Sequence, residues 1–314
     1  MKILLISGFL GAGKTTFIKA MAKATGREFV IVENEFASEG IDGQILSQDE
    51  ATAKMEVWEM AEGCICCSLD LDFSLSVLTI ANTLNPDYLL VEPSGVAQPT
   101  SIIENLEKIQ YERISLLAPI TMIDADNYFS QRREFRHYFE DQLIAAGTLV
   151  LSKSEHLDPQ AFEQIASSLD IPEDVAFPSR HYSQWKKEEW LALLEKELTG
   201  DDIRRIGERF TSRAIKREAD EELESLSVDS LSFQNPDQLL ALLEDMLHGK
   251  YGQVVRAKGF VTIKEETFHV ELVANKFSLL GLGHLSEEDL SEELFHVKIP
   301  GDDSLRHDRL IVIG

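Results

Sequence analysis

Cysteine is scarce in this 314-residue chain, which contains three, and all of them lie in the stretch "GCICC" as Cys64, Cys66 and Cys67. An odd number of cysteines cannot pair off completely, and the rest of the chain offers no second set for disulfides. The sequence therefore excludes a fold that depends on a disulfide framework. Thiolates crowded in this way are instead typical of transition-metal binding or redox chemistry.

Long apolar runs are missing as well. The N-terminal stretch "MKILLISGFLGAGKTT" is apolar for only a few residues before glycines interrupt it. This run is too short to span a bilayer, and no secretory cleavage pattern follows it. We therefore expect no membrane role and a cytoplasmic location, where reducing conditions keep thiols free.

Basic residues are outnumbered: 30 Lys and Arg stand against 55 Asp and Glu, which gives a formal net charge of -25. Such a surface repels nucleic acids and anionic membranes over most of its area. We expect no nucleic-acid partner. Acidic runs such as "EADEELESLS" and "LSEEDLSEEL" are typical of solvated helix faces and linkers.

The hydrophobic content of 44% is sufficient for the core of one large domain or two ordinary ones. Over residues 1–198, short apolar runs such as "KILLIS", "EFVIVEN", "DYLLVE", "PITMID" and "GTLVLSK" alternate with longer segments that suit helices. This rhythm predicts an α/β fold with a doubly wound, mostly parallel sheet. Charged residues then dominate, and we place a linker or hinge over residues 199–226.

Residues 227–314 predict a smaller α+β domain. In "NPDQLLALLEDML", Asn235 suits the N-cap and proline the first turn. The apolar residues recur on one helical face, at Leu239, Leu242, Leu243, Met246 and Leu247. Runs such as "GQVVRAKGFVTI" and "FHVELVA" then predict a small sheet that this helix covers.

A phosphate-binding loop is the clearest motif. The stretch "GFLGAGKTT" has the Gly-x-x-x-x-Gly-Lys-Thr pattern and directly follows the strand-like "KILLIS", so we predict a P-loop NTPase fold. Its glycines let backbone N–H groups surround a phosphate at the start of a helix. Lys14 is expected to reach the β- and γ-phosphates, and Thr15 to ligate Mg²⁺. The predicted phosphate-binding residues are Gly8, Gly11, Ala12, Gly13, Lys14, Thr15 and Thr16.

A carboxylate at the end of a neighbouring strand is the second requirement of such a site. The stretch "DYLLVEPSG" supplies Glu92 after an apolar run, and we assign it to Mg²⁺ and, with Lys14, to catalysis. Gly95 can offer its N–H to the γ-phosphate. A site that contains both Glu92 and Gly95 can respond to the presence or absence of the γ-phosphate.

Base recognition rests on a weaker motif. Guanine-specific proteins of this class commonly carry Asn-Lys-x-Asp after a later strand, whereas "TLVLSKSE" offers Ser152, Lys153 and Glu155. Glu155 keeps the double acceptor on a longer arm, and Lys153 can still cover the base. We favour guanine over adenine, with an ATP-using assembly factor as an alternative.

The cysteines follow the strand-like "KMEVWEM", so we expect them near the carboxyl edge of the sheet, where the nucleotide would lie. Soft thiolates suit Zn²⁺, Co²⁺ or Cu⁺, of which we favour Zn²⁺ or Co²⁺, and two or three thiolates with one exchangeable ligand make an open site. Whether Cys64 is a ligand or packs inward stays open.

Taken together, "GFLGAGKTT", "ENEF" (residues 33–36), "GCICC", "EPSG" and "VVRAKGFV" resemble the CobW-type metallochaperone GTPases, relatives of the hydrogenase and urease nickel-insertion GTPases. The resemblance runs through both halves of the chain. It implies GTP hydrolysis coupled to loading and release of a transition metal, with the cysteines as ligands and "ENEF" in the first switch segment. Glu33 is then an oxygen ligand or an Mg²⁺ partner.

The chain departs from this family in three places. Besides the altered guanine motif, "NEF" is followed by Ala37 and Ser38 instead of Gly-Glu, with Glu39 one step later. A His-rich tract is also missing. The scattered histidines are interpreted as structural or solvated, at positions His248, His269, His284, His296 and His307.

The resulting hypothesis is a nucleotide-gated metal carrier. Mg²⁺-GTP orders the switch segments and tightens the cysteine site, and hydrolysis to GDP releases Zn²⁺ or Co²⁺ to a client metalloenzyme. Turnover is expected to be slow, since no arginine finger is evident, and a homodimer is left open. The rivals are a nucleotide-dependent docking switch with structural or redox-sensing cysteines and, less favoured, a thiol oxidoreductase.

Overall fold

The computed structural model describes residues 1–34, 55–59, 70–111, 113–213, 225–229, 231, 233–252, 254–264, 266–273, 276–281 and 309–313. By its internal contacts the chain divides into two units, Met1–Glu221 and Glu222–Gly314. Each unit is described by itself.

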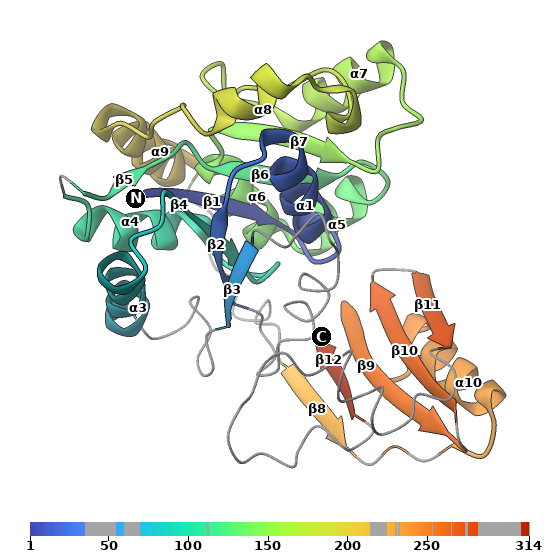
Figure 1. Cartoon of the computed structure of the whole chain (residues 1–314). Coiled ribbons are helices and arrows are strands. Elements are labelled where there is room, and N and C mark those ends of the chain that lie inside the picture. The colour runs from blue at the N-terminus through green and yellow to red at the C-terminus, as the bar shows by residue number, and fades with distance from the viewer. Residues whose placement is uncertain are drawn as a thin grey trace. The chain divides into compact units, whose positions relative to one another are not determined.

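The first unit is built on a parallel sheet. Within the described residues it has seven strands in the order β3-β2-β4-β1-β6-β7, with β5 paired to β1 (Figure 1). Every pairing in it is parallel, so the carboxyl ends of these strands meet at one edge. The strands are β1 (Lys2–Gly8), β2 (Phe29–Asn34), β3 (Met55–Glu59), β4 (Tyr88–Pro93), β5 (Ser115–Leu116), β6 (Ile120–Asp124) and β7 (Thr148–Ser152).

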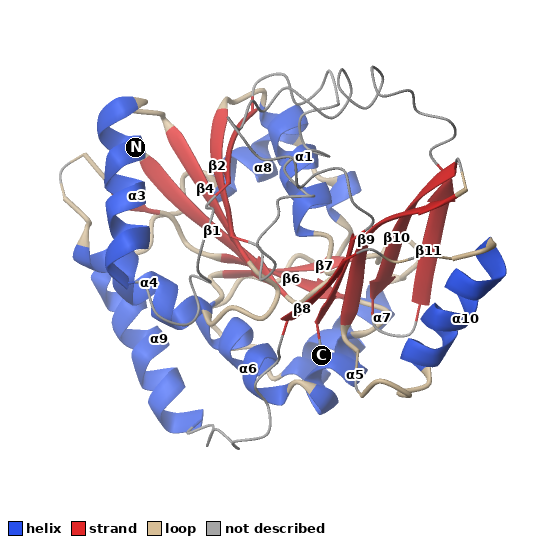
Figure 2. Ribbon diagram, turned by 90° about the horizontal axis from the view of Figure 1, so that it is seen from below, coloured by secondary structure: helices blue, strands red, loops and turns tan. Residues whose placement is uncertain are grey.

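Helices cover both faces of this sheet, as the blue ribbons around the red strands show (Figure 2). The helices of the first unit are α1 (Lys14–Thr25), α3 (Asp70–Thr83), α4 (Pro99–Lys108), α5 (Tyr128–Glu134), α6 (Arg136–Ala145), α7 (Pro159–Leu169), the 3-10 turn η2 (Tyr182–Gln184), α8 (Lys187–Leu193) and α9 (Gly200–Arg213). Alternate residues of β1 serve the two faces: Ile3 and Leu5 pack with α3 and α4, whereas Leu4 and Ile6 pack with α1 and α8. Burial on both faces explains why these strands are continuous apolar runs.

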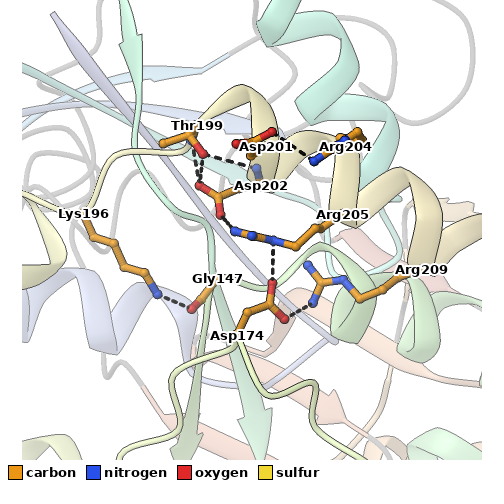
Figure 3. Close-up of polar contacts among 9 residues, drawn as sticks. All are labelled: Gly147, Asp174, Lys196, Thr199, Asp201, Asp202, Arg204, Arg205 and Arg209. Carbon is orange, nitrogen blue, oxygen red and sulfur yellow. Dashed lines mark hydrogen bonds and ion pairs between the residues drawn. The ribbon is translucent and has the colours of Figure 1, made fainter.

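Helix α9 is anchored to the first unit by polar contacts (Figure 3). Thr199 and Asp202 cap its start reciprocally, with the Thr199 N–H donating to Asp202 at 2.8 Å. Arg205 and Arg209 reach the carboxylate of Asp174 at 3.2 and 3.5 Å. Residues 200–213 of the segment that we predicted to be a linker or hinge form this helix, which has polar anchors.

Apolar packing also holds α9. Ile206 is buried in the core beside α4 and α6, and Ile203 packs against the same cluster. The spacing of these two isoleucines is three residues, which places them on one helical face.

The second unit is a small α+β module. Within the described residues, five strands pair antiparallel in the order β11-β10-β9-β12-β8 (Figure 1). Its elements are β8 (Ser225–Asp229), α10 (Pro236–Leu247), β9 (Arg256–Ile263), β10 (Glu266–Val273), β11 (Lys276–Gly281) and β12 (Arg309–Ile313). The cap predicted at Asn235 is confirmed, since its side chain accepts from the Gln238 N–H at 3.2 Å.

The predicted fold class is confirmed: a mostly parallel α/β sheet with a phosphate loop, and a separate α+β unit. Leu239, Leu243 and Met246 of α10 are buried with strand residues of β9 and β10, so the helix covers that sheet as expected. None of the helices in the described part of the chain combines the length and apolarity needed to cross a bilayer.

Candidate functional site

The phosphate loop connects the end of β1 at Gly8 to the start of α1 at Lys14. Gly11 and Gly13 have φ angles of 71° and 81°, in the left-handed region that side chains disfavour. At Gly8 a Cβ atom would lie 2.6 Å from the carbonyl oxygen of Met122. These three glycines are therefore required by local geometry, and they leave the first N–H groups of α1 uncapped by a side chain at Gly13. Helix starts of this kind bind anions.

Lys14, Thr15 and Glu92 come together at this loop. The side chain of Lys14 is buried, and its ammonium donates to the Gly8 carbonyl at 3.1 Å. The Thr15 hydroxyl donates to Glu92 Oε1 at 3.2 Å, although the two residues are 77 positions apart. A hydroxyl and a carboxylate are oxygen ligands that suit Mg²⁺, so the donor set fits this ion.

Gly95 presses against the phosphate loop. A Cβ atom at this position would lie 2.4 Å from the backbone nitrogen of Leu10, so no other residue fits without moving the loop. The carbonyl of Gly95 accepts from Gln142 Nε2 of α6 at 3.0 Å. The segment after β4 is thus in contact with the phosphate loop on one side and held by α6 on the other.

Helix α6 holds the start of α4 through a buried carboxylate. Asp141, which is fully buried, accepts from the Thr100 hydroxyl at 2.5 Å and from the Thr100 N–H at 3.2 Å. Burial raises the pKa of Asp141 to about 6. Beside it, His137 Nε2 lies 3.0 Å from Gln98 Nε2. These contacts make α6 a polar support for the whole segment between β4 and α4.

The predicted base-recognition residues lie directly after β7. Lys153 has a left-handed φ of 53°, and its ammonium donates to the buried Asp124 at 2.7 Å. The Ser152 hydroxyl donates to the Ile123 carbonyl at 3.3 Å, which ties the end of β7 to the end of β6. The side chain of Glu155 is 62% exposed, and its Oε1 lies 3.3 Å from Nε2 of the buried His181.

The predicted cysteine ligands Cys64, Cys66 and Cys67 lie outside the described residues, between β3 and α3. The backbone of Glu33 is described: it pairs with Glu92 of β4 on one side and with Glu59 of β3 on the other. Within the part of the chain that the structure describes, no group of three His, Cys, Asp or Glu side chains is close enough to hold a metal.

Four residues of this edge were not predicted from the sequence: Asp124, Asp141, Gln142 and His181. Asp124 ends the run "PITMID" in the same way as Glu92 ends "DYLLVE", and that parallel was a usable signal. The other three lie on α6 or in the stretch before α8, and no local pattern marks them.

A parallel sheet with this loop at its carboxyl edge defines a nucleotide-binding protein of the phosphate-loop class. Residues 2–174 match the family model described as CobW/HypB/UreG, nucleotide-binding domain, and residues 223–314 match the cobW C-terminal domain. The chain belongs to the CobW/HypB/UreG family, and the resemblance found in its motifs is confirmed.

Several curated proteins are similar to this chain. The zinc chaperone CobW of Pseudomonas aeruginosa is 30% identical over 198 residues, which cover 54% of this chain and 53% of that protein. The zinc chaperone YeiR of Escherichia coli is 34% identical over 160 residues, with coverage of 50% and 48%. Zinc-regulated GTPase metalloprotein activator 1 of Dictyostelium discoideum is 29% identical over 152 residues, with coverage of 42% and 31%. The chain spans about half the length of the first two relatives.

Proposed function

We propose that this protein is a GTP-hydrolysing metallochaperone that carries Zn²⁺ to a client metalloprotein. The observation that carries the proposal is the 3.2 Å hydrogen bond from Thr15 to Glu92, next to the buried Lys14. It brings two oxygen ligands and a cation to the glycine loop, which is what the hydrolysis of a Mg²⁺-bound triphosphate requires.

Lys14, Thr15 and Glu92 each have a role in hydrolysis. Lys14, held by the Gly8 carbonyl, is available to the β- and γ-phosphates, where its charge stabilises the transition state. Thr15 and Glu92 would hold Mg²⁺, which neutralises charge on the triphosphate. A water molecule attacks the γ-phosphorus, the bond to the β-phosphate oxygen breaks, and GDP and phosphate are released.

The segment after β4 is the sensor of the γ-phosphate in this proposal. We assign the Gly95 N–H as the donor to the γ-phosphate, because Gly95 lies against the backbone of Leu10 in the phosphate loop. Gln142 holds the other side of the same residue by its carbonyl. A shift of Gly95 is therefore transmitted to α6 and, through Asp141 and Thr100, to α4.

The register of the sheet supports a link between the nucleotide and the metal. Glu33 and Glu59 stand beside Glu92 in successive strands, and the chain leaves β2 and β3 at this end toward "ENEF" and "GCICC". A change at Glu92 on binding Mg²⁺-GTP is thus next to the point where both segments begin. We assign Cys66 and Cys67 as thiolate ligands and Glu33 as an oxygen ligand, with Cys64 as a third thiolate.

The choice of Zn²⁺ over Co²⁺ rests on the relatives. CobW and YeiR are named zinc chaperones, and the Dictyostelium relative is named a zinc-regulated GTPase. Thiolate-rich sites bind both ions, so the two are compared in the same titration.

The test is a competitive titration of Zn²⁺, and separately of Co²⁺, against a chromophoric chelator. It is made with no nucleotide, with Mg²⁺-GDP and with a non-hydrolysable Mg²⁺-GTP analogue. We expect the triphosphate to raise metal affinity at least about tenfold, or roughly 1.4 kcal/mol of coupling.

Two variants make the titration specific. The double change Cys66→Ala and Cys67→Ala should abolish tight binding in every nucleotide state. Lys14→Ala should keep the metal site and lose the nucleotide effect. Three coincident curves for the unaltered protein would refute the carrier proposal and favour the docking switch. A larger GTP effect on Co²⁺ than on Zn²⁺ would refute the choice of metal.

A further inference from the structure

His181 is a buried histidine in the stretch between α7 and α8. Its side chain is 3% exposed, and its ring lies 4.0 Å from the ring of Tyr182. Tyr182 belongs to a cluster of aromatic rings that includes Phe17 of α1 and Trp190 of α8. The imidazole is therefore held in place by packing that extends to the helix of the phosphate loop.

Hydrogen bonds define which ring nitrogen of His181 carries the proton. Nδ1 accepts from the backbone N–H of Ser183 at 3.2 Å, and the Ser183 hydroxyl lies 2.8 Å from the same nitrogen. Because a backbone N–H can only donate, Nδ1 is the unprotonated nitrogen of the neutral ring. The proton is then on Nε2. Burial lowers the pKa of His181, against the opposing effect of Glu155, which favours this neutral form.

The Nε2 proton is buried and makes no hydrogen bond among the described residues, although one carboxylate lies close to it. Nε2 of His181 lies 3.3 Å from Oε1 of Glu155, which is 26 positions earlier in the sequence. The Glu155 side chain is otherwise 62% exposed. An exposed glutamate samples many rotamers, and ordering it on a ligand costs more entropy than ordering the shorter aspartate. A fixed donor beside one of its oxygens reduces that cost.

Lys153 lies in the same loop as Glu155, and a hydrogen bond holds its side chain. Lys153 is tied to the buried Asp124, whose carboxylate also accepts from the backbone N–H groups of Asp126 and Asn127. Lys153 is thus held by a buried side chain from another strand, and Glu155 lies beside a buried donor that has no hydrogen-bond partner.

We propose that His181 is a positioning residue for Glu155 and thereby sets the preference for guanine. In this role the unpartnered Nε2–H donates to the Glu155 carboxylate when the base binds, and both carboxylate oxygens then accept from guanine, one from N1–H and one from the 2-amino group. The His181 side chain thereby compensates for the extra rotational freedom of glutamate, which stands at the position where this class of proteins commonly has aspartate. This inference rests on the proposed function, in which Glu155 recognises the base.

The test is a double-mutant cycle on nucleotide affinity, with GDP and ADP as ligands in competition with a fluorescent nucleotide at pH 7.5. His181→Phe keeps an aromatic ring and removes the donor. Glu155→Ala removes the acceptor. We expect His181→Phe to weaken GDP binding by about three- to tenfold, the cost of ordering one free side chain, and to leave ADP binding unchanged. In the Glu155→Ala background the same change should have no effect on GDP.

A merely structural role would give a different pattern. If His181→Phe weakens GDP and ADP equally, or weakens GDP as much in the Glu155→Ala background, the inference is wrong. If Glu155→Ala itself leaves the ratio of GDP to ADP affinity unchanged, Glu155 does not recognise the base, and the role of His181 fails with it. This outcome is distinct from a failure of His181 alone, in which Glu155→Ala changes the ratio but His181→Phe does not.

A second variant keeps the test valid if His181→Phe does not fold. His181→Gln retains an N–H donor on a side chain of similar reach, and it should recover most of the GDP preference. A glutamine variant that folds and has the same loss as the phenylalanine variant would overturn the role of the donor.

Discussion

Replacing Asp141 by Asn should make the first unit more stable at neutral pH. Asp141 lies on α6 with no exposed surface and accepts two hydrogen bonds, both from Thr100. Burial raises the pKa of this carboxyl from its ordinary 3.8 to about 6; the Thr100 bonds oppose the rise, and the charge of Glu104 adds to it. Asparagine has the same shape, and its amide can accept from the Thr100 N–H and donate to the Thr100 hydroxyl.

The magnitude follows from the two pKa values. The native protein holds the Asp141 proton more tightly than the unfolded chain, so the contribution of Asp141 to stability is fully present below pH 3.8 and is lost as the pH rises through about 6. The total loss is about 3 kcal/mol, at 1.36 kcal/mol for each unit of pKa. Roughly half of it, about 1 to 2 kcal/mol, falls between pH 5 and 7.5. That window lies above the isoelectric point of about 4.7, where the protein carries net negative charge.

The assay is urea unfolding at several pH values between 5 and 7.5, followed by tryptophan fluorescence. Trp58, Trp185 and Trp190 are the tryptophans of the chain, and all lie in the first unit. The free energy of unfolding is obtained by linear extrapolation for the unaltered protein and for Asp141→Asn. Glu163→Gln on the exposed surface of α7 is the matched control for loss of one carboxylate.

We expect the advantage of Asp141→Asn over the unaltered protein to grow by about 1 to 2 kcal/mol from pH 5 to pH 7.5. The advantage of Glu163→Gln should not grow in this way. If the curves of Asp141→Asn and the unaltered protein stay parallel over this range, the buried charge does not cost stability and the reasoning is refuted.

Three further predictions concern the nucleotide edge. Lys14→Ala should lower GTP turnover by at least about a hundredfold through loss of the cation at the phosphates, and unchanged phosphate release would contradict the assignment. Gly95→Ala places a Cβ atom 2.4 Å from the Leu10 nitrogen, so it should weaken binding of a GTP analogue more than of GDP, as equilibrium titration of both would reveal. Glu155→Gln should shift the preference from GDP toward xanthosine diphosphate, because an amide donor matches the 2-oxo group of xanthine; competition between the two diphosphates measures this, and an unchanged ratio would speak against base recognition by Glu155.

Some features of this protein are determined by short stretches of sequence. The phosphate loop is local: its glycines, Lys14 and Thr15 lie within eight consecutive residues, and their spacing alone predicts the turn and the helix that follows. The cap at Asn235 and the apolar face of α10 depend on residues within one or two turns of each other. The strands could be predicted because burial on both faces requires continuous apolar runs.

Other features depend on contacts between residues distant in sequence, which no local pattern encodes. The sequence could propose Glu92 for the site, but its hydrogen bond to Thr15 forms only because β4 pairs with β1. The support of Gly95 by Gln142 and of Thr100 by Asp141 requires α6 to pack against the segment after β4.

Helix α9 and His181 show the same dependence. The segment that contains α9 has a charged composition typical of a linker, and it is held in the first unit by ion pairs to Asp174 and by burial of Ile206. The role that we propose for His181 depends on the chain folding back beside Glu155. Local periodicity and turn chemistry determine the elements, whereas the partners of a buried polar group are decided by tertiary packing, because burial makes an unsatisfied group costly wherever its partner lies in the sequence.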